Sequence, residues 1–244
     1  MSHLPDPLLS HVIKTPSIKK LAGKRVVLAS ASPRRKEILQ IFGLAPEIIP
    51  STFAEDLVAS SFEDIHEYPV ATATQKAVEV YERLVRENPD NAPDLVIGAD
   101  TVVLTHAQPT TSQTGFSVLP DTVQHLLEKP LDKDDNLRML LDMNGSVCEV
   151  VTVYPVLTSP GYDIKSIDER SLVYFSDNPH HLLEAYVENG EGIDRAGGFA
   201  IQGQGGLLVR KIEGDYHNVV GFPAASFFRL LDITAEEEED FMAI

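Results

Sequence analysis

The pattern of apolar and polar positions divides the chain into short strands and longer amphipathic helices. Short β-prone runs predict strands at 25–28, 47–50, 94–104, 147–157, 170–175 and 207–212. Apolar residues at three- and four-residue spacing predict helices at 33–42, 69–86, 133–143, about 179–188 and about 223–231. Pro155 lacks a backbone N–H, so it is expected to place its strand at a sheet edge or at a bulge.

The turn between the first strand and the first helix, residues 28–36, concentrates polar and basic side chains. Ser32 can cap the helix and Pro33 suits its first position, so backbone N–H groups and the positive end of the helix dipole gather there. Arg34 and Arg35 stand in the first turn, where positive charge is unfavourable unless an anion is bound. This arrangement indicates a phosphate-binding turn that includes Ser32. The alternative is a capped helix with two solvated arginines.

Two charged residues stand out against apolar surroundings. Asp100 interrupts the apolar run 94–104, and an acid there is costly to bury unless it is paired or binds a metal. It is therefore the strongest single catalytic candidate, with a turn or capping aspartate as the alternative. Lys76 lies at the edge of the apolar stripe of the 69–86 helix, where a surface lysine with a buried stem is the ordinary interpretation.

Several stretches fall outside the regular pattern. Residues 1–24 form a polar, proline-rich extension to which we assign no function, and 105–127 are expected to be a surface insertion. Residues 25–233 then make up the folded domain, and 234–244 an acidic tail. The segment 196–206 holds five glycines in eleven residues, which permits close approach of the backbone to a ligand. A flexible hinge would have the same composition.

The composition limits the class of protein. A chain of 244 residues with 43% hydrophobic content can bury the core of one large domain or of two closely joined lobes. The net charge of −17 disfavours sequence-independent binding to nucleic acid. The sequence has neither an apolar run of about 18 residues nor the apolar middle of a signal peptide, so we expect a soluble, cytoplasmic protein without membrane partners.

Metal chemistry is expected to use oxygen ligands. Cys148 is the only cysteine, which excludes an internal disulfide and a cysteine-based zinc site. The eight histidines do not form a pair four residues apart on one helical face, so a histidine-ligated zinc is not expected. Asp100 with Glu55 or Asp56, together with substrate phosphates, instead indicates Mg²⁺ or Mn²⁺.

Six short segments follow one another in a specific order. They are LASASPRR at 28–35, ATQKA at 73–77, GADTVV at 98–103, EKP at 128–130, AGGFAIQG at 196–203 and GDYHNVVGFP at 214–223. Together they resemble the successive motifs of the Maf family of nucleotide pyrophosphatases. The resemblance implies an α/β fold like that of the inosine triphosphate pyrophosphatases: a mixed central sheet with flanking helices in two lobes, and an active-site cleft between them. It also implies hydrolysis of a nucleoside triphosphate to the monophosphate and pyrophosphate, with a divalent cation, by a homodimer.

The resemblance gives roles to individual residues. Asp100 corresponds to the proton acceptor that activates water for attack on the α-phosphorus, and Glu55 helps to hold the metal. Lys76 is grouped with these two as catalytic. The cations that hold the triphosphate and offset charge on the leaving pyrophosphate are Arg34, Arg35, Lys76 and Lys129.

Three further positions are linked to base choice in the family. Arg34, Thr101 and Gln202 resemble the set found in the subgroup acting on dTTP, UTP and related pyrimidine nucleotides, rather than in the subgroup that prefers 7-methyl-GTP. Gln202 can pair with a pyrimidine edge because its amide both donates and accepts hydrogen bonds. The implied function is removal of non-standard pyrimidine triphosphates.

Two departures from the family pattern keep a second hypothesis open. Cys148 stands where many members carry a histidine, and the 105–127 insertion is longer than in compact bacterial members. The alternative function is a nucleotide-binding regulatory protein of cell division with little or no catalysis. Retention of Asp100 among the cations favours catalysis, because a pure binding protein does not need that acid. The charge disfavours an RNA-binding module.

Overall fold

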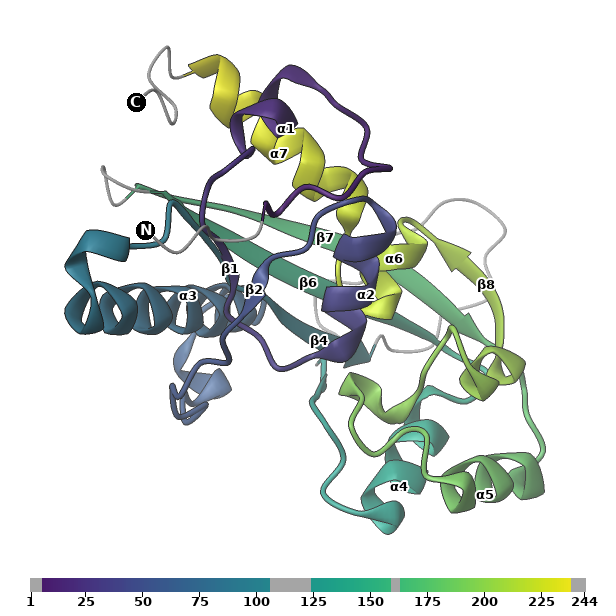
Figure 1. Cartoon of the computed structure of the whole chain (residues 1–244). Helices are drawn as coiled ribbons and strands as arrows, with labels where there is room; N and C mark the ends of the chain where they lie inside the picture. Colours follow the sequence, from purple (N-terminus) through teal and green to yellow (C-terminus); the bar gives the residue numbers. More distant parts are fainter. Residues whose placement is uncertain (1–5, 106–123, 159–162, 238–244) are drawn as a thin grey trace. The chain divides into compact units, whose positions relative to one another are not determined.

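The fold combines helices with a mixed β-sheet. The computed structural model describes residues 6–105, 124–158 and 163–237, which contain seven α-helices and eight β-strands (Figure 1). The hydrogen-bonded strand order is β2-β1-β3-β6-β4-β5, and β7 pairs with both β6 and β8. The described chain is therefore an α/β protein with parallel and antiparallel strand pairs. No helix of this described part is both long and apolar enough to cross a membrane.

The chain divides into two compact units that share two strands. Unit 1 consists of Met1–Asp100, Thr152–Glu169 and Gly221–Ile244, and unit 2 of Thr101–Val151 and Arg170–Val220. β6 (Val147–Thr158) and β7 (Asp163–Phe175) each contribute residues to both units.

The sheet of unit 1 is built on three short apolar strands. β1 (Val26–Leu28) pairs in parallel with β2 (Glu47–Ile48) and with β3 (Leu95–Ile97), and β3 pairs antiparallel with the end of β6. All residues of β1 and β3 are buried, as expected for central strands that are covered on both faces.

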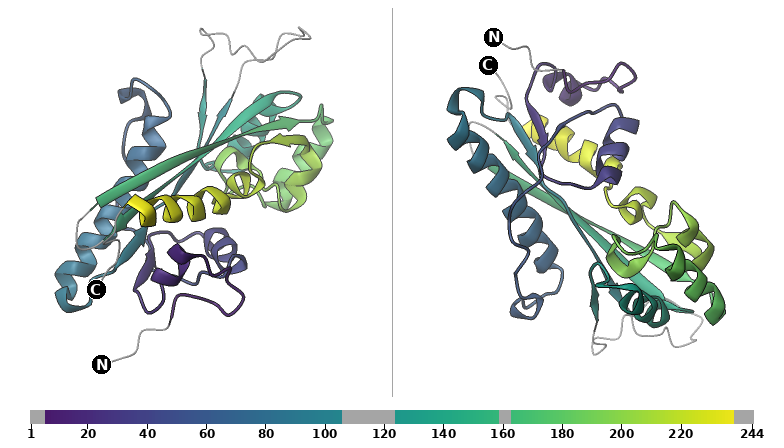
Figure 2. Two further views of the ribbon diagram at one scale, coloured as in Figure 1. Left: turned by 90° about the horizontal axis from the view of Figure 1, so that it is seen from above. Right: turned by 60° about the horizontal axis from the view of Figure 1, so that its bottom comes forward.

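The long helix of unit 1 buries its apolar stripe against this sheet. α3 (Glu67–Glu87) extends the predicted 69–86 helix slightly at both ends and packs on β3 (Figure 2). A buried cluster joins its inner face to the strands, and its members are Val27, Ala29, Ala77, Val80, Leu84, Val96 and Leu157. Burial of such side chains stabilises the fold by about 1.5–3 kcal/mol for each large aliphatic residue.

Gly98 allows α3 to approach the sheet at the point where β3 ends. A Cβ atom at Gly98 would lie 2.5 Å from Ala73 O, 2.9 Å from Pro155 Cγ and 3.0 Å from Ala77 Cβ. Gly98 N also donates to Pro155 O at 3.0 Å. The run 94–104 is therefore two strands, β3 and β4 (Asp100–Thr105), on either side of Gly98–Ala99.

This crowding gives a first prediction. Gly98→Ala is expected to lower the free energy of unfolding by about 1–3 kcal/mol, because the added methyl group must displace backbone or ring atoms. Urea unfolding of the two proteins measures the difference. A midpoint equal to that of the wild type would show that α3 and Pro155 can move apart without cost.

A short helix forms in the N-terminal segment. Residues 1–24 were expected to be a polar, proline-rich extension ahead of the folded domain; α1 (Pro16–Lys20) forms within them and contacts α7 (Ala224–Glu237), as Figure 1 shows. Ile18 and Leu21 are almost fully buried. Two apolar residues in a polar, proline-rich stretch of sequence are too weak a pattern to predict a helix.

Polar contacts fasten the same segment to α7 and to the end of α2 (Pro33–Ile41). Ser17 Oγ and Thr15 Oγ1 both donate to Asp232 Oδ1. Leu9 N donates to Gly43 O at 2.8 Å. The N-terminal segment is therefore an integral part of unit 1.

An aromatic cluster fills the interior of unit 1 beneath α7. Tyr154, Phe222 and Phe227 are fully buried, and their ring centroids lie 5.2–6.0 Å apart in tilted and edge-to-face arrangements. Such pairs add about 0.5–1.5 kcal/mol each beyond their buried area.

Unit 2 has its own hydrophobic core between strands and two helices. β4 pairs antiparallel with β5 (Leu126–Leu127), and β7 pairs antiparallel with β8 (Val209–Glu213). The remaining helices of this unit are α4 (Lys133–Met143), α5 (His180–Asn189) and α6 (Tyr216–Val220).

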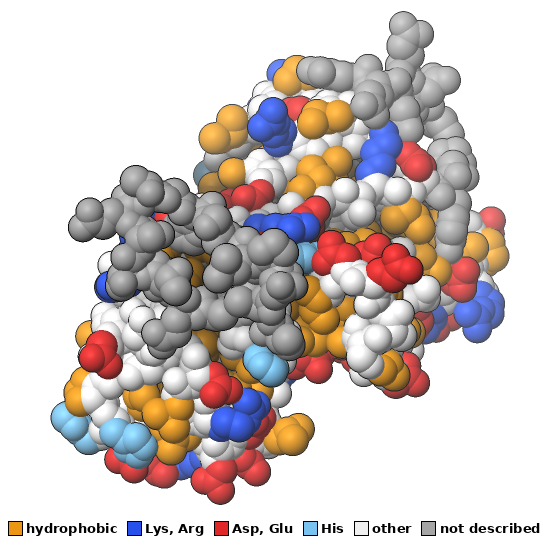
Figure 3. Space-filling model, turned by 180° about the vertical axis from the view of Figure 1, so that it is seen from behind, with side chains coloured by type: hydrophobic (Ala, Val, Ile, Leu, Met, Phe, Trp, Pro, Cys, Tyr) orange, Lys and Arg blue, Asp and Glu red, His pale blue; other side chains and the backbone are white. Residues whose placement is uncertain are grey.

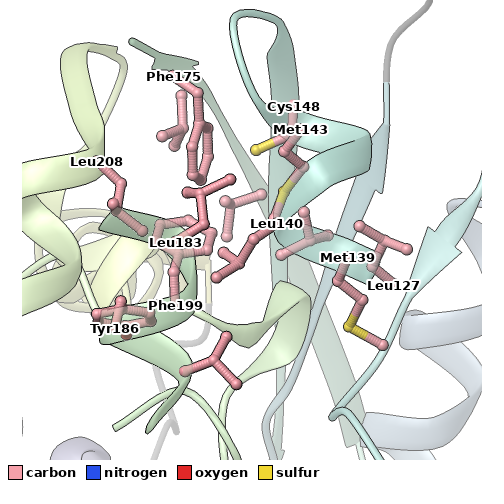
Figure 4. Packing of buried hydrophobic residues seen from close by; sticks show 14 residues of the cluster. Leu127, Met139, Leu140, Met143, Cys148, Phe175, Leu183, Tyr186, Phe199 and Leu208 are labelled. Atoms are coloured by element: carbon pink, nitrogen blue, oxygen red, sulfur yellow. The ribbon is translucent and has the colours of Figure 1, made fainter. Parts of the chain in front are cut away.

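The core of unit 2 is shown in Figure 4. Phe175 of β7 packs edge-to-face on Phe199, with ring centroids 5.1 Å apart, and Leu183 of α5 and Leu140 of α4 belong to the same cluster. Cys148 is a fully buried member, and burial raises the pKa of its thiol. Cys148 is therefore a small apolar core residue at neutral pH.

Some predicted boundaries differ from those of the structure. β6 lies between β3 and β4 and not at an edge. Pro155 is accommodated there because it lies opposite Gly98, just past the end of β3, where its carbonyl oxygen accepts a hydrogen bond from Gly98 N. Within the expected insertion, Thr105 and Leu126–Leu127 belong to the sheet, while 106–123 lie outside the described residues. Likewise α7 continues into the expected acidic tail, to Glu237.

Candidate active site

The β1–α2 turn forms as expected, but its serines act differently. Ser32 occupies the N-cap position of α2 and Pro33 the first helical position, yet the Ser32 side chain makes no capping hydrogen bond. Instead Ser32 N donates to Ser30 Oγ at 3.2 Å. The Ser32 side chain therefore does not satisfy the N–H groups of the first turn of α2, which carries the half-buried Arg34.

Arg35 joins three separate segments of unit 1. Its Nη1 donates to Ser30 Oγ at 2.9 Å and to Ala99 O at 3.0 Å, and its Nε donates to Gly221 O at 3.0 Å. Burial lowers the pKa of the guanidinium, while the negative charges of Asp100 and Glu55 act in the opposite direction. Arg35 thus holds the ends of β1 and β3 and the residue before Phe222 together, close to two carboxylates.

Lys76, Asp100 and Glu55 form one charged cluster. Lys76 Nζ lies 2.9 Å from Asp100 Oδ1 and 2.9 Å from Glu55 Oε1. The side chains of Lys76 and Asp100 are only 11% and 13% exposed, whereas that of Glu55 is 53% exposed. The interpretation of Lys76 as an ordinary surface lysine is therefore wrong.

Each member of this cluster comes from a different element. Lys76 projects from α3 beside the buried Ala73 and Ala77, Asp100 is the first residue of β4, and Glu55 lies on the loop after β2. The break at Gly98–Ala99 starts β4 at Asp100, which is why the acid stands at a strand end and not in mid-strand. Sequence reasoning named all three residues but could not establish that one ammonium joins both acids.

Two carboxylates that converge on one positive atom are a suitable environment for a cation. Hard divalent ions prefer such oxygen ligands, and the shared contact with Lys76 brings an oxygen of Glu55 and one of Asp100 to the same side of α3. Of the two loop acids considered, Glu55 and not Asp56 makes this contact. Within the described ranges no group of three or more His, Cys, Asp or Glu side chains is arranged around a common metal position.

The remaining candidates lie in unit 2. Thr101 follows Asp100 in β4 and is half-buried, whereas Lys129 and Gln202 are exposed. The glycine-rich segment meets the segment of Lys129 through Gly197, whose N–H donates to Glu128 O at 3.0 Å. The structure therefore brings together the segments that carry Lys129 and Gln202.

The same segment needs a glycine where it crosses β4. Gly197 has φ +69°, and a Cβ atom there would come within 2.9 Å of Val103 Cγ2. The backbone of this segment therefore passes close to Val103 of β4, two residues after Thr101, and this contact is one reason for its glycines.

The face shown in Figure 3 gives the wider charge distribution. Among the residues described on it, lysine and arginine side chains are scattered between acidic and hydrophobic ones and do not form a stripe. The residues described on this face therefore form no broad positive patch.

Sequence reasoning missed two polar residues that support the cluster. Ser30 accepts hydrogen bonds from Arg35 and Ser32, and Glu79 binds the loop that leads to Glu55. The only sequence signal for Glu79 is its position three residues after Lys76, on the same helix.

Comparisons with known proteins show what this chain is similar to. The family model described as "Maf-like protein" matches residues 25–234. The "dTTP/UTP pyrophosphatase" of Schizosaccharomyces pombe is 36% identical over 248 residues, which cover 97% of this chain and 95% of that protein. The "dTTP/UTP pyrophosphatase" of Thermococcus kodakarensis is 36% identical over 208 residues, or 85% of this chain and 96% of that protein.

A human relative is larger than this chain. The "Probable bifunctional dTTP/UTP pyrophosphatase/methyltransferase protein" of Homo sapiens is 42% identical over 227 residues, which cover 90% of this chain but only 34% of the human protein. The chain thus spans about a third of that relative. With a family model matched over most of its length and relatives covered almost end to end, the chain belongs to the Maf family.

Proposed function

We propose that this chain hydrolyses dTTP, UTP and related pyrimidine nucleoside triphosphates to the monophosphate and pyrophosphate. The observation that carries the proposal is the cluster in which Lys76 contacts both Asp100 and Glu55 at 2.9 Å, with the half-buried Arg35 close to both carboxylates. The names of the relatives, dTTP/UTP pyrophosphatases from fungi and archaea, support the same reaction.

In this proposal Asp100 acts as the general base. It takes a proton from water, whose oxygen forms a bond to the α-phosphorus while the bond between that phosphorus and the bridging oxygen of the β-phosphate breaks. Pyrophosphate leaves with the electron pair of that bond. Lys76 orients the Asp100 carboxylate, since its ammonium contacts one carboxylate oxygen.

The cations would act on the phosphates. Arg34 and Lys129 would bind the triphosphate and stabilise charge that develops on pyrophosphate, together with the N–H groups at the start of α2. Arg35 would contribute its positive charge from a position held by the protein itself. Glu55 and Asp100 would hold a divalent cation, Mg²⁺ or Mn²⁺, which supplies charge neutralisation at the phosphates when bound.

Base choice is assigned to Arg34, Thr101 and Gln202. The exposed Gln202 can offer a donor and an acceptor to a pyrimidine edge.

The proposal also covers the fold, the oligomeric state and the location. The fold would resemble that of the inosine triphosphate pyrophosphatases, with two lobes and a substrate cleft. The protein would be a homodimer in the cytoplasm.

The test is a panel of nucleotides. We expect metal-dependent release of pyrophosphate from dTTP and UTP, with slower release from the purine nucleotides ATP, GTP, ITP and 7-methyl-GTP, because the site is assigned to pyrimidines. Pyrophosphate is measured with Mg²⁺ or Mn²⁺ and after chelation. Turnover confined to 7-methyl-GTP or ITP would keep the reaction and refute the base assignment.

The regulatory alternative is not favoured, since the relatives are named as pyrophosphatases. It would gain support only if calorimetry showed tight nucleotide binding while the whole panel gave no pyrophosphate.

A further inference from the structure

Glu79 is bound by the start of the loop that carries Glu55. Ser51 Oγ donates to Glu79 Oε2 at 2.7 Å, and Thr52 donates through both its backbone N, at 2.9 Å to Oε2, and its hydroxyl, at 2.9 Å to Oε1. Arg83 Nε donates to Glu79 Oε1 at 2.7 Å. Both carboxylate oxygens of Glu79 therefore accept two hydrogen bonds each.

Arg83 strengthens this anchor from the same helix. Besides its bond to Glu79, its Nη2 donates to Pro50 O at 2.9 Å. Three consecutive loop residues, Pro50, Ser51 and Thr52, are thus held by two side chains of α3 that lie one turn apart.

The hydrogen bonds keep Glu79 ionised. Burial alone would raise the pKa of Glu79, but the hydrogen bonds from Arg83, Ser51 and Thr52 together lower that pKa to about 2. The carboxylate is therefore a permanent acceptor at neutral pH, and charged acceptors make the stronger hydrogen bonds.

The anchor and the candidate active site share one helix and one loop. On α3, Glu79 follows Lys76 by three residues, so both project from neighbouring turns of one face. On the loop, Glu55 follows Thr52 by three residues and contacts Lys76. The loop is therefore fixed to α3 at two places, once through Glu79 and once through the Lys76–Glu55 ion pair.

The second of these contacts is the weaker one. Glu55 is 53% exposed, and ion pairs at that exposure hold a side chain poorly because water screens them. The Glu79 anchor is more shielded, with a Glu79 side chain only 24% exposed and four donors converging on it. The position of Glu55 therefore depends on the anchor at Ser51 and Thr52.

We infer that Glu79 is a positioning residue that places Glu55 against Lys76 and Asp100 through the 50–55 loop. The inference rests on the proposed function insofar as Glu55 acts in the reaction. Loss of the anchor lets the loop move away from α3, so the Glu55 carboxylate no longer stands beside Lys76 and Asp100 for most of the time.

The kinetic test uses Glu79→Gln in two backgrounds. In the otherwise wild-type chain, Glu79→Gln is expected to lower kcat for dTTP about ten- to hundredfold and to change KM less than about threefold. A loss of this size is typical when a residue that supports the ligands of a metal ion is replaced. In a Glu55→Gln background the same change is expected to lower kcat less than about twofold, because the residue through which Glu79 acts is already altered. A purely structural role would lower kcat equally in both backgrounds and would refute the inference.

Two further variants sharpen the test. Glu79→Asp keeps the charge and is expected to recover part of the loss, while Glu87→Gln, an exposed acid at the end of α3, is the matched control and is expected to leave kcat unchanged. Failure of Glu79→Asp to exceed Glu79→Gln would contradict a role for the charged acceptor.

Hydrogen exchange separates this inference from the proposed function. In Glu79→Gln the amides of residues 52–56 are expected to exchange about tenfold faster than in the wild type, while those of β1 and β3 keep their rates. Unchanged exchange at 52–56 would overturn the inference even if the enzyme proves active. Faster exchange there, in a chain that hydrolyses no nucleotide, would uphold the positioning of the loop and refute the proposed function alone.

Discussion

Asp100→Asn is expected to lower kcat for dTTP about 10³-fold, within the range that a general base contributes. Asparagine has the size of aspartate and can keep a hydrogen bond to Lys76, which contacts Asp100 Oδ1 at 2.9 Å. It cannot take a proton from water, so the chemical step slows while the surrounding contacts remain. Nucleotide affinity is expected to change little, since Arg34 and Lys129, the side chains proposed to bind the phosphates, are untouched.

Single-turnover kinetics and calorimetry together measure this effect. The first gives the rate of pyrophosphate formation on the enzyme, and the second gives the dissociation constant of dTTP. If binding were lost while turnover per bound nucleotide stayed constant, Asp100 would be a ligand-binding residue and not the base. Thermal unfolding of the same variant controls for loss of the folded state.

Arg35→Met is expected to be the most destabilising of these substitutions, at about 3–5 kcal/mol. Methionine fills much of the same space but leaves Ser30 Oγ, Ala99 O and Gly221 O without the donors that now bind them at 2.9–3.0 Å. It also removes the positive charge that faces Asp100 and Glu55. For a chain of this size each kcal/mol corresponds to roughly 2–4 °C in Tm.

Calorimetric melting of Arg35→Met and of Lys36→Met tests this expectation. Lys36 follows Arg35 in α2 but is exposed, so its replacement is expected to change Tm by less than about 2 °C. Equal melting temperatures for the wild type and Arg35→Met, combined with a large rise in KM, would assign Arg35 to ligand binding alone.

Much of the fold could be predicted because its signals are local. The helix 133–143 was predicted with the bounds that the structure has, since Asp132 caps it and Asn144–Gly145 follow its end. α3 was predicted because its apolar positions repeat with the helical period over five turns. α1 was missed because its stability comes from contacts with α7, more than 200 residues away in the sequence.

The candidate site was predictable in part for the same reason. Asp100 and Arg35 each look unusual within their own segment, and this local anomaly identifies them, whereas Lys76 was given a role only by the resemblance to the family. Glu79 does not look unusual on an exposed helix surface, because its partners Ser51 and Thr52 come from a different loop. A sequence pattern shows only the neighbours of a residue along the chain. A residue that supports the site, such as Glu79, acts through partners that are distant in the sequence and close only in the folded protein.

The part of the chain that folds together extends further toward the N-terminus than the part that matches the family. The family match begins at residue 25, yet Ala45 N donates to Pro7 O at 2.7 Å and Leu8 pairs with Leu44 across an antiparallel bridge. A chain begun at residue 25 would keep every motif residue while it uncovers Leu44 and leaves Asp232 without Ser17. Fusion partners and affinity tags therefore belong ahead of Pro7, where their attachment leaves the packing of α2 and α7 intact.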